Sequence, residues 1–209
     1  VPVYSDPSIP GTWTGLNTDD VYSSIISIGF PFLFYGNAYT DLKVSSNGYV
    51  TFNTALTGFS HFGILNNGGA LSATTGFPQN LPSFLYAEAI IMGAYHDIDV
   101  NINTSPTRRI QYTTVGAAPH RKWILSFYKI PLYSVANGCG NSFENTHQII
   151  LYESTGIIEV LMLSKQSCTV WNQGRAMIGI QNFNRDQALM APGRAASDPP
   201  WGSIGMNES

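Results

Sequence analysis

Short apolar segments of strand length, separated by turn residues, recur along the whole chain. Aromatic and β-branched residues dominate these segments, and such residues favour β-strands. We expect strands at residues 21–28, 30–35, 41–46, 49–53, 89–95, 107–113, 121–130, 143–152, 157–163 and 176–181. The first four strands should be separated by turn-forming residues, namely Gly29, Pro31, Gly36 and the Asn47-Gly48 pair. The pattern predicts an all-β fold: an antiparallel β-sandwich of roughly ten strands with long loops and little helix.

The domain organisation follows from the same pattern. Residues 121–130 are apolar on both faces of the expected strand, which places this strand at the centre of a sheet. No internal repeat or interior linker divides the chain, so we assign residues 1–209 to a single domain. The chain begins at Val1 rather than Met and shows no obvious end signal, so we expect it to be a piece of a longer protein with neighbouring domains.

Residues 54–83 form a long polar stretch. A loop of about 30 residues inside a compact domain is often functional, so we expect this stretch to bind a ligand together with two later loops. The candidate ligand-binding residues are Phe59, Phe62, Asn66, Asn67, Trp171 and Trp201. Loop aromatics can stack on sugar rings, but each one alone more often covers a hydrophobic core. The partner would be a surface glycan or a surface protein.

The composition favours an extracellular protein. Charged residues make up only 11% of the chain, against about 25% in an average globular domain, and Gly, Ser, Thr and Asn are abundant. The net charge is −3 and the basic residues form no patch, so we expect no nucleic-acid partner. No apolar run reaches the roughly 18 residues of a membrane helix, so we expect no direct membrane insertion.

The two cysteines, Cys139 and Cys168, are expected to form a disulfide. A hairpin that turns at Ser154-Thr155 pairs Leu151 with Ile158 and continues outward residue by residue. The cysteines then face each other at its open end if the register is adjusted by one bulge. The alternative is a pair of buried free thiols. A disulfide would indicate an oxidising compartment.

Two phrases, IGFPFLFYG at residues 28–36 and VSSNGYVTF at residues 44–52, resemble the opening of nidogen-like domains. Similar phrases follow in the same order, and they are IIMGAYHDID at 90–99, WILSFY at 123–128, QIILY at 148–152 and MIGIQN at 177–182. A close variant recurs in large Bacteroidetes surface proteins that leave the cell by the type IX route. The resemblance implies a secreted or surface-attached module without established catalytic residues. The stretch at residues 54–83 has no counterpart in it.

An acidic stripe follows the apolar strand at residues 89–95. If this stripe continues as a strand, Asp97, Asp99, Asn101 and Asn103 share one face. Calcium is bound by six to eight oxygen ligands, so Asp97, Asp99 and Asn101 are candidate ligands of Ca²⁺. The alternative is an edge strand with a polar outer face and no ion. The spacing does not match an EF-hand.

Catalytic motifs are missing from the sequence. His96 lies beside Asp97, but no G-x-S-x-G supplies a nucleophile, and no H-E-x-x-H or phosphate-binding loop occurs. We therefore expect a non-enzymatic extracellular module of a bacterial cell-surface adhesin that serves adhesion, gliding motility or filament spacing. A calcium-supported carbohydrate-binding module is the alternative, and a secreted hydrolase is a more distant one.

Overall fold

The computed structural model describes residues 11–64, 80–102, 107–133, 139, 143–169 and 172–195. Within these residues the chain forms eleven strands and a single turn of 3-10 helix, η1 (Asn172–Gly174). The strands are β1 (Thr12–Trp13), β2 (Ile26–Phe34), β3 (Asn37–Val44), β4 (Tyr49–Thr51), β5 (Ile90–Tyr95), β6 (Arg109–Val115), β7 (Lys122–Pro131), β8 (Glu144–Tyr152), β9 (Ile158–Lys165), β10 (Met177–Gln181) and β11 (Ala188–Met190). None of the described segments contains a helix long and apolar enough to cross a membrane.

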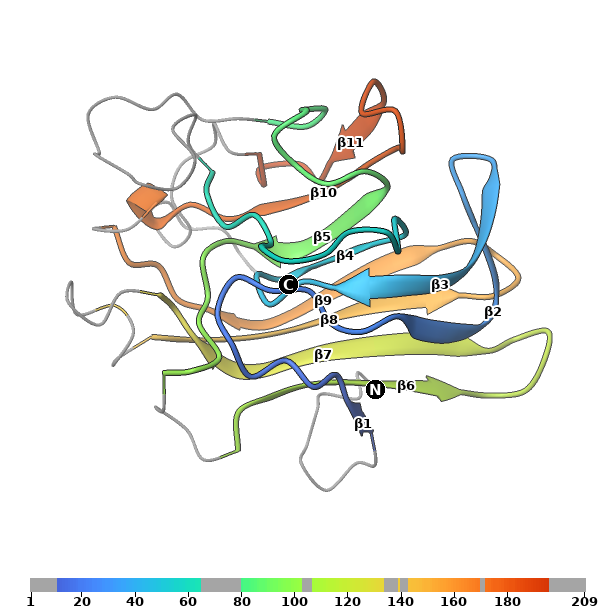
Figure 1. Ribbon diagram of the computed structural model, residues 1–209, viewed down its shortest axis with the longest axis horizontal. Helices are drawn as coiled ribbons and strands as arrows, with labels where there is room; N and C mark the ends of the chain where they lie inside the picture. Colours follow the sequence, from blue (N-terminus) through green and yellow to red (C-terminus); the bar gives the residue numbers. More distant parts are fainter. Residues whose placement is uncertain are drawn as a thin grey trace.

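The strands form two antiparallel sheets (Figure 1). The first sheet has the order β1-β6-β7-β8-β9, and the second has the order β11-β10-β5-β4-β3-β2. The all-β sandwich predicted from the sequence is therefore confirmed. The prediction that residues 121–130 form a central strand is also confirmed, because β7 lies in the middle of the first sheet.

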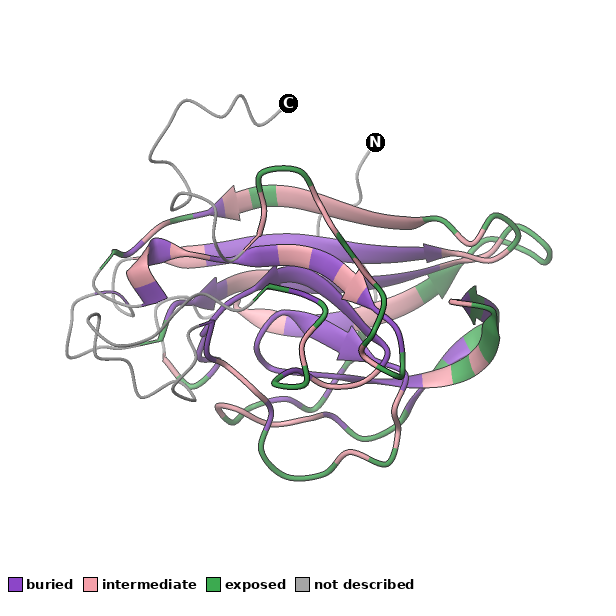
Figure 2. Cartoon of the chain, turned by 90° about the horizontal axis from the view of Figure 1, so that it is seen from above, coloured by how far each residue is buried: buried purple, intermediate pink, exposed green. Residues whose placement is uncertain are grey.

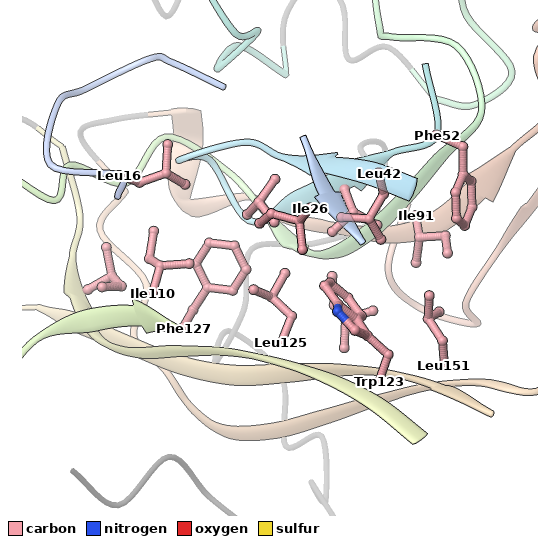
Figure 3. Close-up of a cluster of buried hydrophobic side chains, with 14 of the residues drawn as sticks. Leu16, Ile26, Leu42, Phe52, Ile91, Ile110, Trp123, Leu125, Phe127 and Leu151 are labelled. Carbon is pink, nitrogen blue, oxygen red and sulfur yellow. The ribbon is translucent and has the colours of Figure 1, made fainter. Parts of the chain in front are cut away.

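The main hydrophobic core lies between the two sheets (Figure 3). Trp123, Leu125 and Phe127 alternate along β7 and point toward Ile26 and Leu42 of the opposite sheet. Burying a large apolar side chain contributes roughly 1.5–3 kcal/mol, so this layer is the main source of stability. In Figure 2 the buried residues are concentrated in the strands at the centre, and the connecting turns are mostly exposed or intermediate.

β2 differs from the prediction, because Gly29 and Pro31 lie inside it and do not break it. The strand is at the edge of its sheet, where a proline costs no ladder hydrogen bond. The register shifts between Ser27 and Phe32, and Gly29 has a positive φ of 85° at this irregularity. The separate strands expected at residues 21–28 and 30–35 are thus wrong. The predicted turns at Gly36 and at Asn47-Gly48 are confirmed.

The β8–β9 hairpin and its disulfide are confirmed. Leu151 pairs with Ile158, and the predicted register continues outward until a shift by one residue at Thr146. Beyond the open end, Cys139 and Cys168 are joined by a disulfide, with their Cα atoms 5.8 Å apart and both side chains buried.

The loop expected at residues 54–83 belongs partly to the core. Ile64 and Leu81 are buried in a second apolar cluster with Tyr49, Ile90 and Met92. Ile91 lies in the main core, so its two neighbours on β5 must face the other side of the second sheet. The described ends of this loop therefore cover the outer face of that sheet. Four predicted ligand-binding residues lie outside the described residues: Asn66, Asn67, Trp171 and Trp201.

Candidate metal centre

Three carboxylates from two distant segments converge beyond the end of β5. Asp19, Asp20 and Asp97 each offer one oxygen, and these oxygens all lie within 4.8 Å of one another. Asp97 follows β5, whereas Asp19 and Asp20 precede β2. We refer to these three residues as the acidic cluster. Carboxylate oxygens are preferred calcium ligands, so the cluster is a candidate cation site.

Asn47, in the turn between β3 and β4, connects the two segments of the acidic cluster. Its side-chain amide donates to Asp20 Oδ1 at 2.7 Å. Its side-chain oxygen accepts from the backbone N–H of Ile98 at 3.2 Å. Asn47 is fully buried, so both hydrogen bonds are shielded from water. This one residue therefore fixes the spacing between Asp20 and the chain beside Asp97.

Gly48 allows the Asn47 turn to lie against β5. Its φ is 84°, in the left-handed region that glycine tolerates best. A Cβ atom at this position would lie 2.5 Å from the carbonyl oxygen of Ala94. The same close approach allows the N–H of Gly93 to donate to the Gly48 carbonyl at 2.9 Å. The Ser-Asn-Gly phrase of the sequence is therefore the support of the acidic cluster.

Hydrogen bonds from two sides hold the segment that carries Asp20. Ser46 Oγ accepts from the N–H of Val21 at 3.1 Å, and the N–H of Ser46 donates to the Val21 carbonyl at 2.9 Å. The N–H of Ser60 donates to the Asp20 carbonyl at 2.6 Å. Asp20 itself has a φ of 53°, which is uncommon outside glycine but tolerated by aspartate. The carboxylate is thus presented by a well-anchored backbone.

The segment after β5 is not the edge strand that the alternative interpretation required. Only an isolated bridge between Ile98 and Leu132 has strand character there. Asp97 and Asp99 are buried, so they do not form an exposed polar stripe. Burial differs from the prediction because the acidic residues fold inward against Asp19 and Asp20. Asn103 lies outside the described residues.

Asp99 and Asn101 lie next to the acidic cluster but have other hydrogen-bond partners. Asp99 Oδ1 accepts from the N–H of Asn101 at 2.7 Å. In the amide orientation that satisfies its neighbours, the Asn101 side chain donates to the Asn17 carbonyl and accepts from the N–H of Asp19 at 3.2 Å. Asn101 therefore positions the Asp19 segment. Of the three predicted metal ligands, Asp97 alone belongs to the cluster.

The sequence reasoning missed Asp19 and Asp20. They form the one pair of adjacent acidic residues in the sequence, and they precede the phrase at residues 28–36 that resembles nidogen-like domains. This acidic pair could have been recognised as a candidate for metal binding. It could not be joined to Asp97 from the sequence, because their proximity depends on the packing of two segments on the Asn47 turn.

Burial and mutual repulsion oppose ionisation in the acidic cluster. Burial, together with the charges of Asp20 and Asp99, raises the pKa of Asp19 to about 7. Burial also raises the pKa of Asp20 to about 6, against the lowering effect of the Asn47 hydrogen bond. The pKa of Asp99 is raised by burial, with the N–H of Asn101 and the charge of Arg108 acting against it. A bound cation would favour the ionised carboxylates.

Two of the predicted ligand-loop aromatics lie beside this site. The Phe59 ring is 64% exposed and meets the partly buried Phe62 edge to face, with the ring centroids 5.4 Å apart. Phe59 forms a β-bridge with Val21, and Ser60 bonds to Asp20. The exposed ring is therefore attached to the backbone that carries the acidic cluster. Its role in ligand binding stays a prediction.

A family model described as NIDO related matches residues 4–200 of the chain. The chain belongs to the NIDO-related family. Membership confirms the nidogen-like resemblance of the sequence phrases and indicates a non-catalytic extracellular module. No curated protein and no solved structure gave a match.

Proposed function

We propose that this NIDO-related domain is a non-enzymatic module of a bacterial cell-surface adhesin, exported by the type IX route and serving adhesion or gliding motility. The Cys139–Cys168 disulfide supports an extracellular location, because such bonds persist in oxidising compartments. The low content of charged residues and the family membership support the same location. The proposed partner is a surface glycan or a surface protein.

The observation that carries a binding role, rather than a spacer role alone, is the acidic cluster. At an effective dielectric constant near 20, two ionised carboxylates 4.8 Å apart repel each other by about 2–4 kcal/mol. Three carboxylates placed this close together therefore do not stabilise the fold by themselves. A divalent cation reverses the sign of the interaction and cross-links the two segments. We therefore assign calcium as the ion.

Calcium should stabilise the folded domain, because a ligand that binds only the folded state raises stability by mass action. At a concentration about a hundredfold above the dissociation constant, the gain is about 2.7 kcal/mol, or several degrees in melting temperature. The measurement is thermal unfolding by circular dichroism in millimolar calcium, in millimolar magnesium and in chelator. We expect a clear upward shift with calcium and a smaller one with magnesium, which demands stricter octahedral geometry.

Matched variants locate the effect. Asp20→Asn and Asp97→Asn should each abolish most of the calcium shift. Asp41→Asn is the control, since Asp41 lies in β3 and accepts a hydrogen bond from Thr40. An unchanged melting temperature of the wild type in calcium would contradict the cation site. So would a full calcium shift in Asp20→Asn.

A calcium-supported carbohydrate-binding module is the second candidate function. The exposed Phe59 ring favours it, because an aromatic ring held beside a cation site offers a sugar both a stacking surface and a ligand for its hydroxyl oxygens. A glycan array probed with and without chelator distinguishes the two candidates. Glycan binding that is lost in chelator supports this second candidate, whereas binding only to surface proteins supports a protein-directed adhesin.

A further inference from the structure

A pocket lined by both apolar and polar residues opens between β1, β6 and the turn at Val100-Asn101. Its volume is about 480 Å³, within the roughly 300–1,000 Å³ range of small-molecule sites. Its polar and aromatic lining consists of Trp13, Asn17, Asn101, Arg108, Arg109 and Gln111. An indole, guanidinium groups and side-chain amides therefore surround one cavity.

We propose that this pocket binds a carboxylated sugar of an acidic glycan, with the ring on Trp13 and the carboxylate on Arg109. The proposal rests on the recognition function proposed above and gives it a ligand class. The acidic cluster and the pocket are adjacent, because the Asn101 side chain bonds to both Asn17 and Asp19. A cation that fixes Asp19 would therefore also fix one wall of the pocket.

Trp13 is an exposed aromatic residue in β1. Its side chain is 58% exposed, although an indole normally loses most of its exposure on folding. Its backbone is held by β1, where Trp13 pairs with Gln111 of β6. Directly paired residues lie on the same face of a sheet, so the indole and the Gln111 amide flank the same side. The flat indole can stack on the C–H face of a sugar, and the amide can bind its hydroxyls.

Arg109 supplies a cation to the pocket. Its Nε donates to the Thr107 carbonyl at 3.3 Å, which orients the guanidinium group. Both salt bridges of the described residues use other arginines, Arg121 and Arg185. The four N–H groups on the terminal nitrogens of Arg109 suit a carboxylate, which guanidinium groups often bind with two parallel hydrogen bonds.

Arg108 has a different role, because it supports the pocket wall. Its Nε donates to the Val100 carbonyl at 2.9 Å, and its charge lies near Asp99. It therefore connects the start of β6 to the turn that carries Asn101. Arg109 is consequently the arginine that we assign to the ligand.

Gln111 is a buried polar residue that lines the pocket. A Cβ atom on Gly11 would lie 3.1 Å from the Gln111 Cδ atom. The glycine therefore gives the amide room at this point. A side-chain amide both donates and accepts hydrogen bonds, as vicinal sugar hydroxyls require.

The ligand class follows from the combination of these groups. A neutral sugar would stack on Trp13 but would leave the Arg109 cation without an anion. An acidic peptide would satisfy the cation but would present no flat ring of C–H groups to the indole. A uronate or sialate residue satisfies both in one ring.

Isothermal titration calorimetry tests the proposal on the intact domain in calcium. The acidic ligands are oligogalacturonate, oligomannuronate, a hyaluronan oligosaccharide and sialyllactose. Methyl-esterified oligogalacturonate, a cello-oligosaccharide and oligoglutamate serve as comparisons. We expect at least one acidic sugar to bind and the neutral sugars and the peptide to bind at least about tenfold more weakly.

Two variants and their controls assign the contacts. Arg109→Gln should weaken binding of the acidic sugar about tenfold to a hundredfold and remove the preference over neutral sugars. Trp13→Ala should weaken every sugar about tenfold. Arg194→Gln and Phe84→Ala change a half-buried cation and an exposed aromatic side chain that do not line the pocket, and should leave binding unchanged. Thermal unfolding of each variant verifies that it is folded.

Three results would overturn the proposal: no acidic sugar binds, Arg109→Gln keeps the preference for acidic sugars, or oligoglutamate binds as tightly as the sugars. The calcium-induced melting shift is an independent readout. A calcium shift without sugar binding would reject the glycan site and keep the cation site. Sugar binding without a calcium shift would reject the cation site and keep this one.

Discussion

His147 and His96 are buried between and beside the sheets in their neutral forms. The His147 ring stacks on Phe127 with the centroids 4.5 Å apart, and its Nδ1 lies 3.1 Å from the Asn145 amide nitrogen. Burial lowers the pKa of His147 to about 3, while the Gly48 carbonyl acts in the opposite direction. The pKa of His96 lies well below its usual value because of burial, with the charges of Lys165 and His147 adding to the effect.

We predict that protonation of His147 in the unfolded state destabilises the domain in mild acid. The pKa is about 3 in the folded state and about 6.5 in the unfolded chain, so the unfolded chain binds more protons between these values. Stability is therefore complete above about pH 6.5 and falls as the pH decreases toward 3. At about pH 4.5, His147 alone costs about 2–3 kcal/mol.

Urea unfolding of the wild type and His147→Gln across this pH range checks the prediction. Glutamine does not titrate, so the variant should be less stable near pH 7 and should lose that disadvantage as the pH falls. The raised pKa values of Asp19 and Asp20 favour the folded state in acid, which is the opposite sign. That effect is common to both proteins and cancels in their difference. A difference that stays constant with pH would contradict the prediction.

At the level of secondary-structure elements, two turn glycines with nearly the same φ differ in the space available for a side chain. Gly36, in the β2–β3 turn, has a φ of 80°, and a Cβ atom there would meet nothing within 4 Å. Gly48 has a φ of 84°, and the Ala94 carbonyl blocks the same atom. Gly36→Ala should cost about 1–2 kcal/mol for backbone strain alone. Gly48→Ala should cost about 3 kcal/mol or more and disturb the acidic cluster.

Chemical denaturation of both variants compares these costs, and the calcium shift of each reports on the cluster. We expect Gly36→Ala to retain the full calcium shift and Gly48→Ala to lose part of it. Equal destabilisation by the two substitutions would contradict the prediction, because it would show that the close packing of the Asn47 turn on β5 adds no cost to the substitution of Gly48.

Strands with a clear period of apolar residues could be predicted from the sequence. Very short strands, and segments whose position depends on tertiary packing, could not. The β8–β9 register follows from one turn and a two-residue period, so local information specified it. β1 and β11 have two and three residues, which is too short for any period to be recognised. β2 was split because the meaning of Pro31 depends on its edge position, which is a property of the sheet. Asp97 was found as a ligand candidate, but its partners come from a segment that tertiary packing brings to it.

For the whole molecule, the sandwich supports a corner where two candidate sites meet. The acidic cluster depends on the Asn47 turn of the second sheet, and the pocket beside Trp13 depends on β1 and β6 of the first. Asn17 and Asn101 border the pocket, and Asn101 also bonds to Asp19 of the cluster. A cation in the cluster would thus couple the two sheets at this corner. Rigid placement of loop residues by a sandwich is a common basis of binding.

The disulfide is the covalent link at the open end of the β8–β9 hairpin, and its removal should affect the whole molecule. Cys139 and Cys168 are separated by 29 residues, and closing a loop of this length stabilises a fold by about 3–4 kcal/mol through the entropy of the unfolded chain. The double variant Cys139→Ala/Cys168→Ala should therefore melt about 10 °C lower than the wild type. Reductant should lower the melting temperature of the wild type by a similar amount and leave the double variant unchanged. Because both cysteines are buried beside the core, part of the loss would come from packing, and the reduced wild type separates the two contributions by keeping both sulfurs. A double variant that melts within a few degrees of the wild type would show that the hairpin register and the core hold this end without the covalent bond.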